Sequence, residues 1–116
     1  MKKDDSVFLQ HILESIEYIE EFVENKSKSE FEESVMLQDA VIRRLGVLGE
    51  AAKNLSNSII QKHTEIAWKK IAGTRDKLIH GYFGIDLDIV WSVIKTDLPE
   101  LKEKIQKILR ELKINK

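Results

Sequence analysis

The chain contains no cysteine, one proline and five glycines in 116 residues. The absence of cysteine excludes a disulfide framework, a thiolate nucleophile and a zinc site built on cysteine. So little proline and glycine disfavours a sandwich or barrel rich in turns and favours helices. No stretch approaches the ~20 apolar residues of a membrane-spanning helix, so we expect no membrane association.

The N-terminus also lacks a secretory signal, because Lys2 and Lys3 are followed at once by Asp4 and Asp5 and no long apolar run develops. A cytoplasmic location is therefore expected. Apolar residues make up 42% of the chain and charged residues 34%, which is typical of a globular protein rather than a disordered one. The length predicts one domain, residues 1–116, with a single modest core.

Charge is distributed unevenly, although the net charge is only −1. Residues 1–40 carry four Lys and eleven Asp or Glu, a net charge of −7, whereas residues 41–84 carry eight Lys or Arg and three acids, a net charge of +5. A local positive field can attract phosphates. By itself, however, the asymmetry favours acidic and basic helices that pack beside each other.

Apolar residues recur at steps of three and four, which predicts amphipathic helices. The first helix is capped by Asp5 or Ser6 and closes at Asn25 and Lys26; after it, Ser29 and Glu32 have the spacing of a capping box. The apolar positions of this helix are Phe8, Leu9, Ile12, Leu13, Ile16, Ile19, Phe22 and Val23.

A second helix is predicted over roughly 35–60, with Gly46 and Gly49 inside it. Glycine costs ~1 kcal/mol relative to alanine in a helix interior, so the pair suggests close approach by another helix, within the chain or across a dimer. Its buried stripe is predicted to comprise Val41, Leu45, Leu48, Ala52, Leu55 and Ile59.

Further helices are predicted over about 67–83, over 86–96 and from an N-cap at Asp97 to about Leu112, with Pro99 in the first turn of the last one. The inward positions of the last helix are Leu101, Ile105, Ile108, Leu109 and Leu112. The pattern predicts an all-α fold, a four- to five-helix bundle.

The stretch "GTRDKLIHGYFG", residues 73–84, gathers Arg75, Asp76, His80 and Tyr82 within eight positions. Asp76 and His80 lie four apart and share a helix face, so the carboxylate can hold one imidazole nitrogen and leave the other free for proton transfer. Arg75 and His80 are five apart, about 140° around a helix, and are not direct neighbours. An ordinary polar network on a solvated helix face explains this spacing equally well.

The other two histidines favour structural roles. His11 is expected at the surface or the core edge, and His63 is expected to cap the end of the second helix. No two histidines have metal-ligand spacing, so we expect no metal and no cofactor. Trp68 and Trp91 are expected to fill the core rather than to stack on RNA bases, and Arg43 and Arg44 to take structural roles or to extend a phosphate-binding surface.

"RDKLIHGYF" resembles the signature of HEPN domains, and with a tyrosine two residues after the histidine it resembles the HepT branch of that family. Three blocks look like HepT segments in the same order: "DAVIRRLGVLGEAAKNLS" (39–56), "WKKIAGTRDKLIHGYFGIDLDIVW" (68–91) and "DLPELKEKI" (97–105). The resemblance covers roughly residues 7 to 110. It implies a HEPN-type bundle over the whole chain.

The resemblance further implies a toxin that cleaves RNA without a metal. Arg75 and His80 match the catalytic pair of the family, and Asp76 would orient His80. Family members are homodimers in which two such motifs share one cleft, so RNA and a second copy are the implied partners.

The resemblance gives Tyr82 another role, as the acceptor of AMP from a partner nucleotidyltransferase of the MntA antitoxin type. An AMP group there would block RNA by bulk and charge; an amphipathic cap on the helix end is the structural alternative for Tyr82. Two other functions stay open for the protein. It is either a non-catalytic module that presents a nucleotide or partner to a minimal nucleotidyltransferase, or a structural dimer with a vestigial motif.

Overall fold

The computed structural model describes residues 4–79 and 86–114, with side chains for residues 4–74 and 86–113. These residues form helices and no strand, which confirms the predicted all-α helical bundle. The elements are α1 (Asp5–Val23), α2 (Lys28–Glu33), α3 (Val35–Lys53), α4 (Asn57–Lys62), α5 (Trp68–Ile79), α6 (Leu87–Ser92), the π-helical turn η1 (Val93–Asp97) and α7 (Leu98–Ile114).

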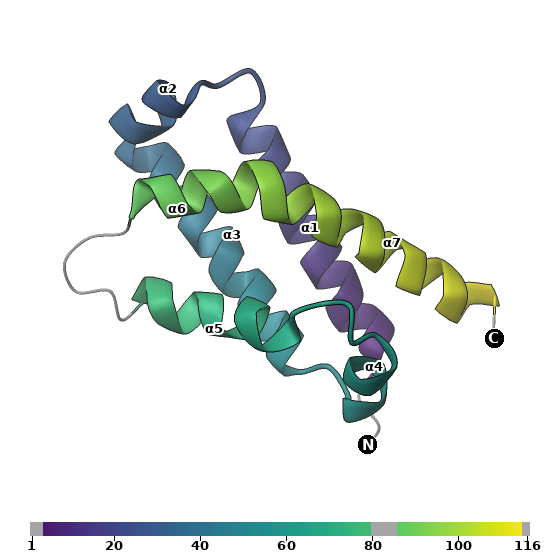
Figure 1. The fold of residues 1–116 in the computed structure, drawn as a ribbon. Coiled ribbons are helices and arrows are strands. Elements are labelled where there is room, and N and C mark those ends of the chain that lie inside the picture. Colours follow the sequence, from purple (N-terminus) through teal and green to yellow (C-terminus); the bar gives the residue numbers. More distant parts are fainter. Residues whose placement is uncertain (1–3, 80–85, 115–116) are drawn as a thin grey trace.

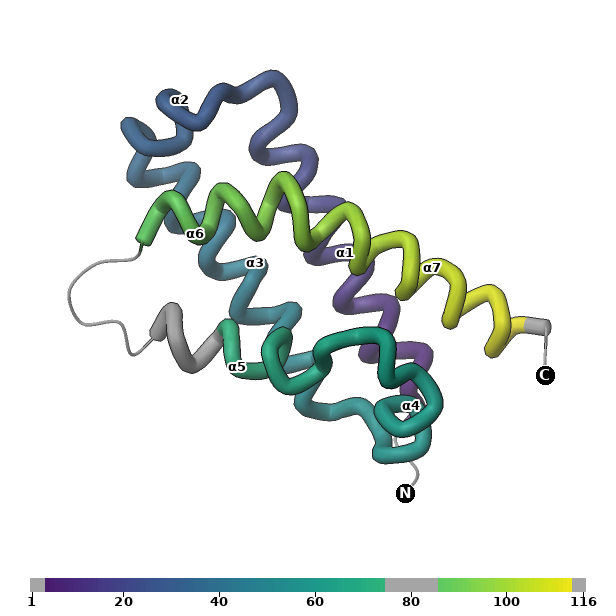
Figure 2. The backbone as a smooth tube through the Cα atoms, in the orientation of Figure 1, coloured from purple at the N-terminus to yellow at the C-terminus, as the bar shows by residue number. Residues whose placement is uncertain are grey.

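Helices α1 and α3 run side by side in opposite directions and form the centre of the bundle (Figure 1). The segments α6, η1 and α7 follow one another as a single continuous rod that crosses over both of them (Figure 2). Helix α5 packs mainly on the C-terminal half of α3, on the same side as that rod but separated from it.

The core follows the periodicity that the sequence predicts. All six positions of the second predicted stripe, from Val41 to Ile59, are buried, and so are Leu101, Ile105 and Ile108 of α7. Leu109 and Leu112 are only partly buried because they lie toward the free end of the rod. The largest fully buried side chains are Phe31, Leu9, Ile12, Ile16, Ile19 and Leu45.

The ends of the first helix differ slightly from the predicted ones. Asp4, rather than Asp5 or Ser6, is the N-cap, and its Oδ1 accepts a hydrogen bond from the Ser6 N–H at 3.0 Å. Asn25 lies just past the helix with φ of 61°, a left-handed conformation that asparagine tolerates at helix ends. The prediction that Asn25 closes the helix is confirmed.

The capping box forms two residues earlier than the spacing of Ser29 and Glu32 suggested. Ser27 Oγ accepts from the Glu30 N–H and Glu30 Oε1 accepts from the Ser27 N–H, each at 3.1 Å. The prediction was wrong because α2 already begins at Lys28, which places Ser29 inside the helix.

The long second helix predicted over 35–60 is in fact two helices, because the chain breaks at residues 54–56. Ser56 caps α4 by accepting from the Ile59 N–H at 3.3 Å. Asp5 of α1 in turn accepts from Ser56 N at 2.8 Å and from Ser56 Oγ at 2.6 Å. This contact joins residues 51 positions apart, and a periodicity argument contains no information about it.

The two glycines of α3 are not equivalent. Gly49 is buried, whereas a Cβ added at Gly46 would meet nothing within 4 Å. The prediction that Gly46 allows another helix of the same chain to approach closely was therefore wrong. A partner across a dimer remains a proposal.

Candidate functional site

Helix α5, which begins the motif-bearing segment, is fixed at its N-terminal end. The Trp68 side chain is buried, as predicted, and its Nε1 donates to the carbonyl oxygen of His63 at 2.9 Å. The Trp68 backbone N–H donates to Ile66 O, also at 2.9 Å. Ile71 and Ala72 then pack against the core. The first turns of α5 are thus held on α3, and the helix direction carries the chain to the motif.

The predicted helix over 67–83 is confirmed as far as Ile79. Arg75 and Asp76 lie in α5, directly after Thr74, while their side chains are outside the described part. His80 and Tyr82 lie outside the described residues. The distances that would relate Arg75, Asp76, His80 and Tyr82 to one another therefore remain predictions.

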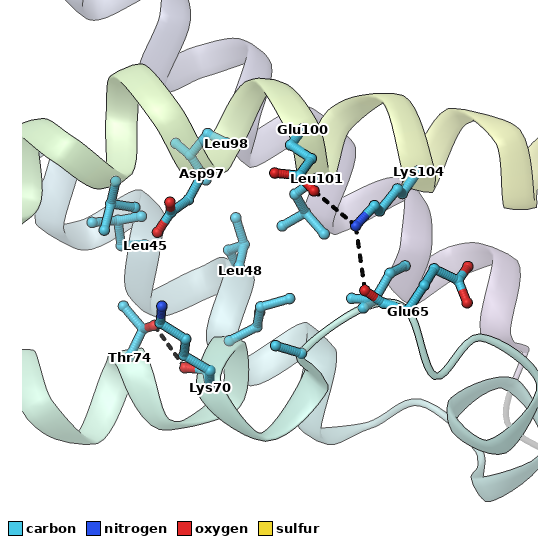
Figure 3. A pocket seen from close by; sticks show the side chains of 14 residues that line it. Leu45, Leu48, Glu65, Lys70, Thr74, Asp97, Leu98, Glu100, Leu101 and Lys104 are labelled. Atoms are coloured by element: carbon cyan, nitrogen blue, oxygen red, sulfur yellow. Dashed lines mark hydrogen bonds and ion pairs between the residues drawn. The ribbon is translucent and has the colours of Figure 1, made fainter.

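A cleft opens next to the motif, between α3 on one side and α5 and the α7 rod on the others (Figure 3). Its volume is about 240 Å³. Its floor is apolar and consists mainly of Leu45, Leu48, Ile66, Ile71, Leu98 and Leu101. The sequence patterns did not reveal this cleft, because its residues come from positions 45 to 104.

The two ends of the cleft carry different polar groups. At one end Lys104 Nζ donates to Glu100 Oε1 at 3.0 Å and to the carbonyl oxygen of Glu65 at 3.3 Å. At the other end Asp97 points across the cleft toward Thr74 and Lys70 (Figure 3). The second end lies beside Thr74, and α5 continues from there into Arg75.

Asp97 is not the N-cap that the sequence suggested, because no helix starts there. It is the last residue of η1, a π-helical turn in which Leu98 N–H bonds to Val93 O, five residues earlier. The ring of a proline clashes with the carbonyl four residues before it in a regular α-helix, and the wider turn carries the rod past Pro99 without a break. Such turns are frequent at functional sites, and this one places Val93 and Asp97 at the cleft.

The exposed Glu65 carboxylate is perturbed at the closed end of the cleft. A hydrogen bond from its own backbone N–H holds the pKa of Glu65 below its ordinary value of 4.5, and the His63 ring adds to the effect. The distance from His63 Nδ1 to Glu65 Oε1 is 3.4 Å. The ionised form of Glu65 is therefore favoured in the folded protein.

The arginines of α3 take different positions. Arg43 is exposed, while the guanidinium of Arg44 lies 4.3 Å from the centroid of the Tyr18 ring. Tyr18 stacks in turn on Phe22, with ring centroids 6.2 Å apart. This cation–π contact gives Arg44 the structural role that the sequence favoured; a contact of either arginine with phosphate remains a prediction.

Within the described residues, the remaining candidates have structural positions. His63 caps α4 as predicted, and His11 is exposed beside Phe8. Trp91 is only partly buried and packs on Phe31, with ring centroids 5.4 Å apart. Residues 4–79 and 86–114 contain no group of three or more His, Cys, Asp or Glu that could hold a metal ion. No helix in those ranges is both long and apolar enough to cross a bilayer.

Comparison with known proteins places the chain among ribonucleases. The family model described as "Ribonuclease HepT-like" matches residues 12–108. The chain is 44% identical to the "Probable ribonuclease HepT" of Thermococcus cleftensis, over 93% of this chain and 98% of that protein. It is 42% identical to a "Putative RNase" of Caldanaerobacter subterraneus, over 91% of this chain and 95% of the relative.

A longer relative is the "Gamma-glutamylcyclotransferase and putative RNase" of Methanocaldococcus jannaschii, 52% identical over all of this chain. The chain spans 52% of the length of that relative, so the activities named for the longer protein are not transferred whole. No solved structure matches the chain significantly. The matched region, residues 12–108, contains both the cleft and the stretch from Arg75 to Tyr82. The chain therefore belongs to the HepT-like ribonuclease family.

Proposed function

We propose that the protein is a metal-independent endoribonuclease and the toxin of a toxin–antitoxin pair, with an active site at a homodimer cleft. The observation that carries the proposal is the family match over residues 12–108, which includes Arg75 and His80. The net charge of +5 over residues 41–84 supports an RNA partner. We expect this activity in the cytoplasm.

The chemistry needs few protein groups, because RNA supplies its own nucleophile. The 2′-hydroxyl attacks the adjacent phosphorus and loses its proton to His80 of one subunit, and His80 of the other subunit gives a proton to the departing 5′-oxygen. Arg75 stabilises the extra negative charge of the crowded phosphorane with fixed donors. Asp76 accepts a hydrogen bond from the imidazole and orients it. The products are a 2′,3′-cyclic phosphate and a free 5′-hydroxyl.

Two subunits serve this mechanism better than one. One chain supplies one His80, and the reaction needs a proton acceptor and a proton donor at the same time. A dimer that brings two copies of the motif together supplies both. Gly46, which is open to solvent within the chain, is a candidate position for close contact between the subunits.

Cleavage of RNA in EDTA tests the catalytic proposal. We expect His80→Ala or Arg75→Ala to lower the rate by about 10²-fold or more, with unchanged circular dichroism. His11→Ala is the matched control, because His11 is an exposed histidine outside the motif. Undiminished cleavage by both motif variants would refute the assignment. Nucleotide binding without any cleavage by the wild type would favour a non-catalytic module instead.

The proposed off-switch is AMP transfer to Tyr82 by a nucleotidyltransferase antitoxin. The tyrosine oxygen attacks the α-phosphorus of ATP and pyrophosphate leaves, so Tyr82 gains a bulky anionic group two residues from His80. Co-expression with the transferase should add AMP mass to the peptide that contains Tyr82. Tyr82→Phe should abolish the addition and Tyr18→Phe should not. AMP mapped to another residue would contradict this assignment.

A further inference from the structure

We propose that the cleft between α3, α5 and α7 binds one nucleobase of the RNA substrate, and that Asp97 selects a base with an exocyclic amino group. This inference rests on the proposed ribonuclease function and adds a specificity subsite to it. The subsite lies beside the motif because Thr74, at the cleft, directly precedes Arg75 in α5.

The size and the floor of the cleft fit a single base. Sites for drug-sized ligands have volumes of roughly 300–1,000 Å³, and this one has about 240 Å³. Leu45 and Leu48 from α3, with Leu98 and Leu101 from α7, are buried beneath it. Aliphatic walls of this kind cover the faces of a flat ring and exclude water from them.

The charge of the rim disfavours a phosphate inside the cleft. The rim carries three carboxylates and two ammonium groups, and one of these ammonium groups, Lys104, is already bonded to Glu100 at 3.0 Å. An anion would therefore meet net negative charge. A neutral base avoids this repulsion, while the phosphate that follows it along the strand can reach Arg75.

The open end of the cleft carries a pattern of acceptors that favours an amino group. Asp97 points toward Thr74 and Lys70 (Figure 3), and no described residue forms a hydrogen bond or ion pair with its carboxylate. Thr74 Oγ1 donates to Lys70 O at 2.9 Å, so the lone pairs of the hydroxyl remain acceptors. A carboxylate accepts well from the exocyclic amino group of a base such as cytosine, and uracil has no such group.

The first experiment compares cleavage of RNA oligonucleotides that differ in one base beside the scissile bond. Wild type should cleave substrates with A, C or G at that position about tenfold more efficiently than those with U. Asp97→Asn should bring this ratio close to one, because an amide offers both a donor and an acceptor. Asp39→Asn, an exposed aspartate of α3 outside the cleft, should keep the ratio of the wild type.

The second experiment fills the cleft. Ala67 is exposed and lines it, so Ala67→Trp should raise KM about tenfold with kcat nearly unchanged, the pattern for loss of uniform substrate binding. Gln61→Trp on α4 is the matched control, because Gln61 is exposed and does not line the cleft. A shift from dimer to monomer in Ala67→Trp would overturn the proposal in favour of a second copy as occupant.

Binding is measured separately, so that failure of the subsite and failure of the ribonuclease function can be told apart. Cytidine 5′-monophosphate should shift the NMR methyl signals of Leu45 and Leu48 more than uridine 5′-monophosphate does, and Asp97→Asn should remove the difference. RNA cleavage without these shifts, or without any base preference, would overturn the subsite alone. Shifts in a protein that cuts no RNA would refute the ribonuclease function and leave a nucleobase site.

Discussion

The two sides of α3 are filled to different degrees. Toward α1 and α7, aliphatic side chains close the space completely, and Lys102 Nζ ties α7 to Glu20 Oε1 of α1 at 2.8 Å. Toward α5, the helix packs on α3 but leaves a cleft of about 240 Å³ between itself and the rod. Stability is thus concentrated on the first side, and the second is free to bind a substrate.

Truncation of core side chains should give the largest difference between the two sides. Ile16→Ala, at a fully buried position of α1, should cost roughly 2–5 kcal/mol of unfolding free energy through lost burial and a new cavity. Ile71→Ala, at the partly buried edge of the cleft, should cost less than half as much. Urea denaturation measures both values. Equal costs would show that the α5 side is as tightly packed as the α1 side.

Loss of the hydrogen bond that anchors α5 should have a smaller effect. Trp68→Phe keeps most of the buried ring but leaves the carbonyl of His63 without the bond from Nε1. An unsatisfied buried group costs about 1–3 kcal/mol. Hydrogen exchange should quicken in α5 while α1 stays protected; uniform loosening of both helices would contradict a local anchor.

Gly46→Ala tests the exposed face of α3. An added Cβ meets no atom within 4 Å, so alanine should stabilise the chain by at most about 1 kcal/mol through helix propensity. Thermal unfolding at low protein concentration measures this gain. A loss of stability together with weaker self-association would instead place a second subunit against Gly46.

The smallest expected effect concerns pH at the closed end of the cleft. The lowered pKa of Glu65 means that folding favours its ionised form. Its contribution to stability is therefore present above pH 4.5 and is lost as the pH falls through the lowered value. Glu65→Gln should flatten the fall of Tm below pH 4.5 slightly, whereas Glu103→Gln, at an exposed position of α7, is the control. An unchanged slope in Glu65→Gln would show that the shift has no effect on stability.

The sequence predicted most of the local structure because helical periodicity is a local signal. Every position of the stripe from Val41 to Ile59 is buried, and Asn25 ends the first helix. The errors at Ser56 and Asp97 have a different origin. Ser56 breaks the helix where Asp5, 51 residues away, bonds to it, and η1 continues the helix past Asp97 through a wider turn.

The candidate site divides in the same way. The sequence by itself determined the family, through the spacing of Arg75, His80 and Tyr82 and the ordered blocks around them, because these residues lie within one short segment. Only the tertiary structure decided that Leu45, Asp97 and Lys104 meet beside that segment. They come from helices whose relative placement depends on packing, and hydrophobic packing is non-directional, so no pattern along the chain encodes it.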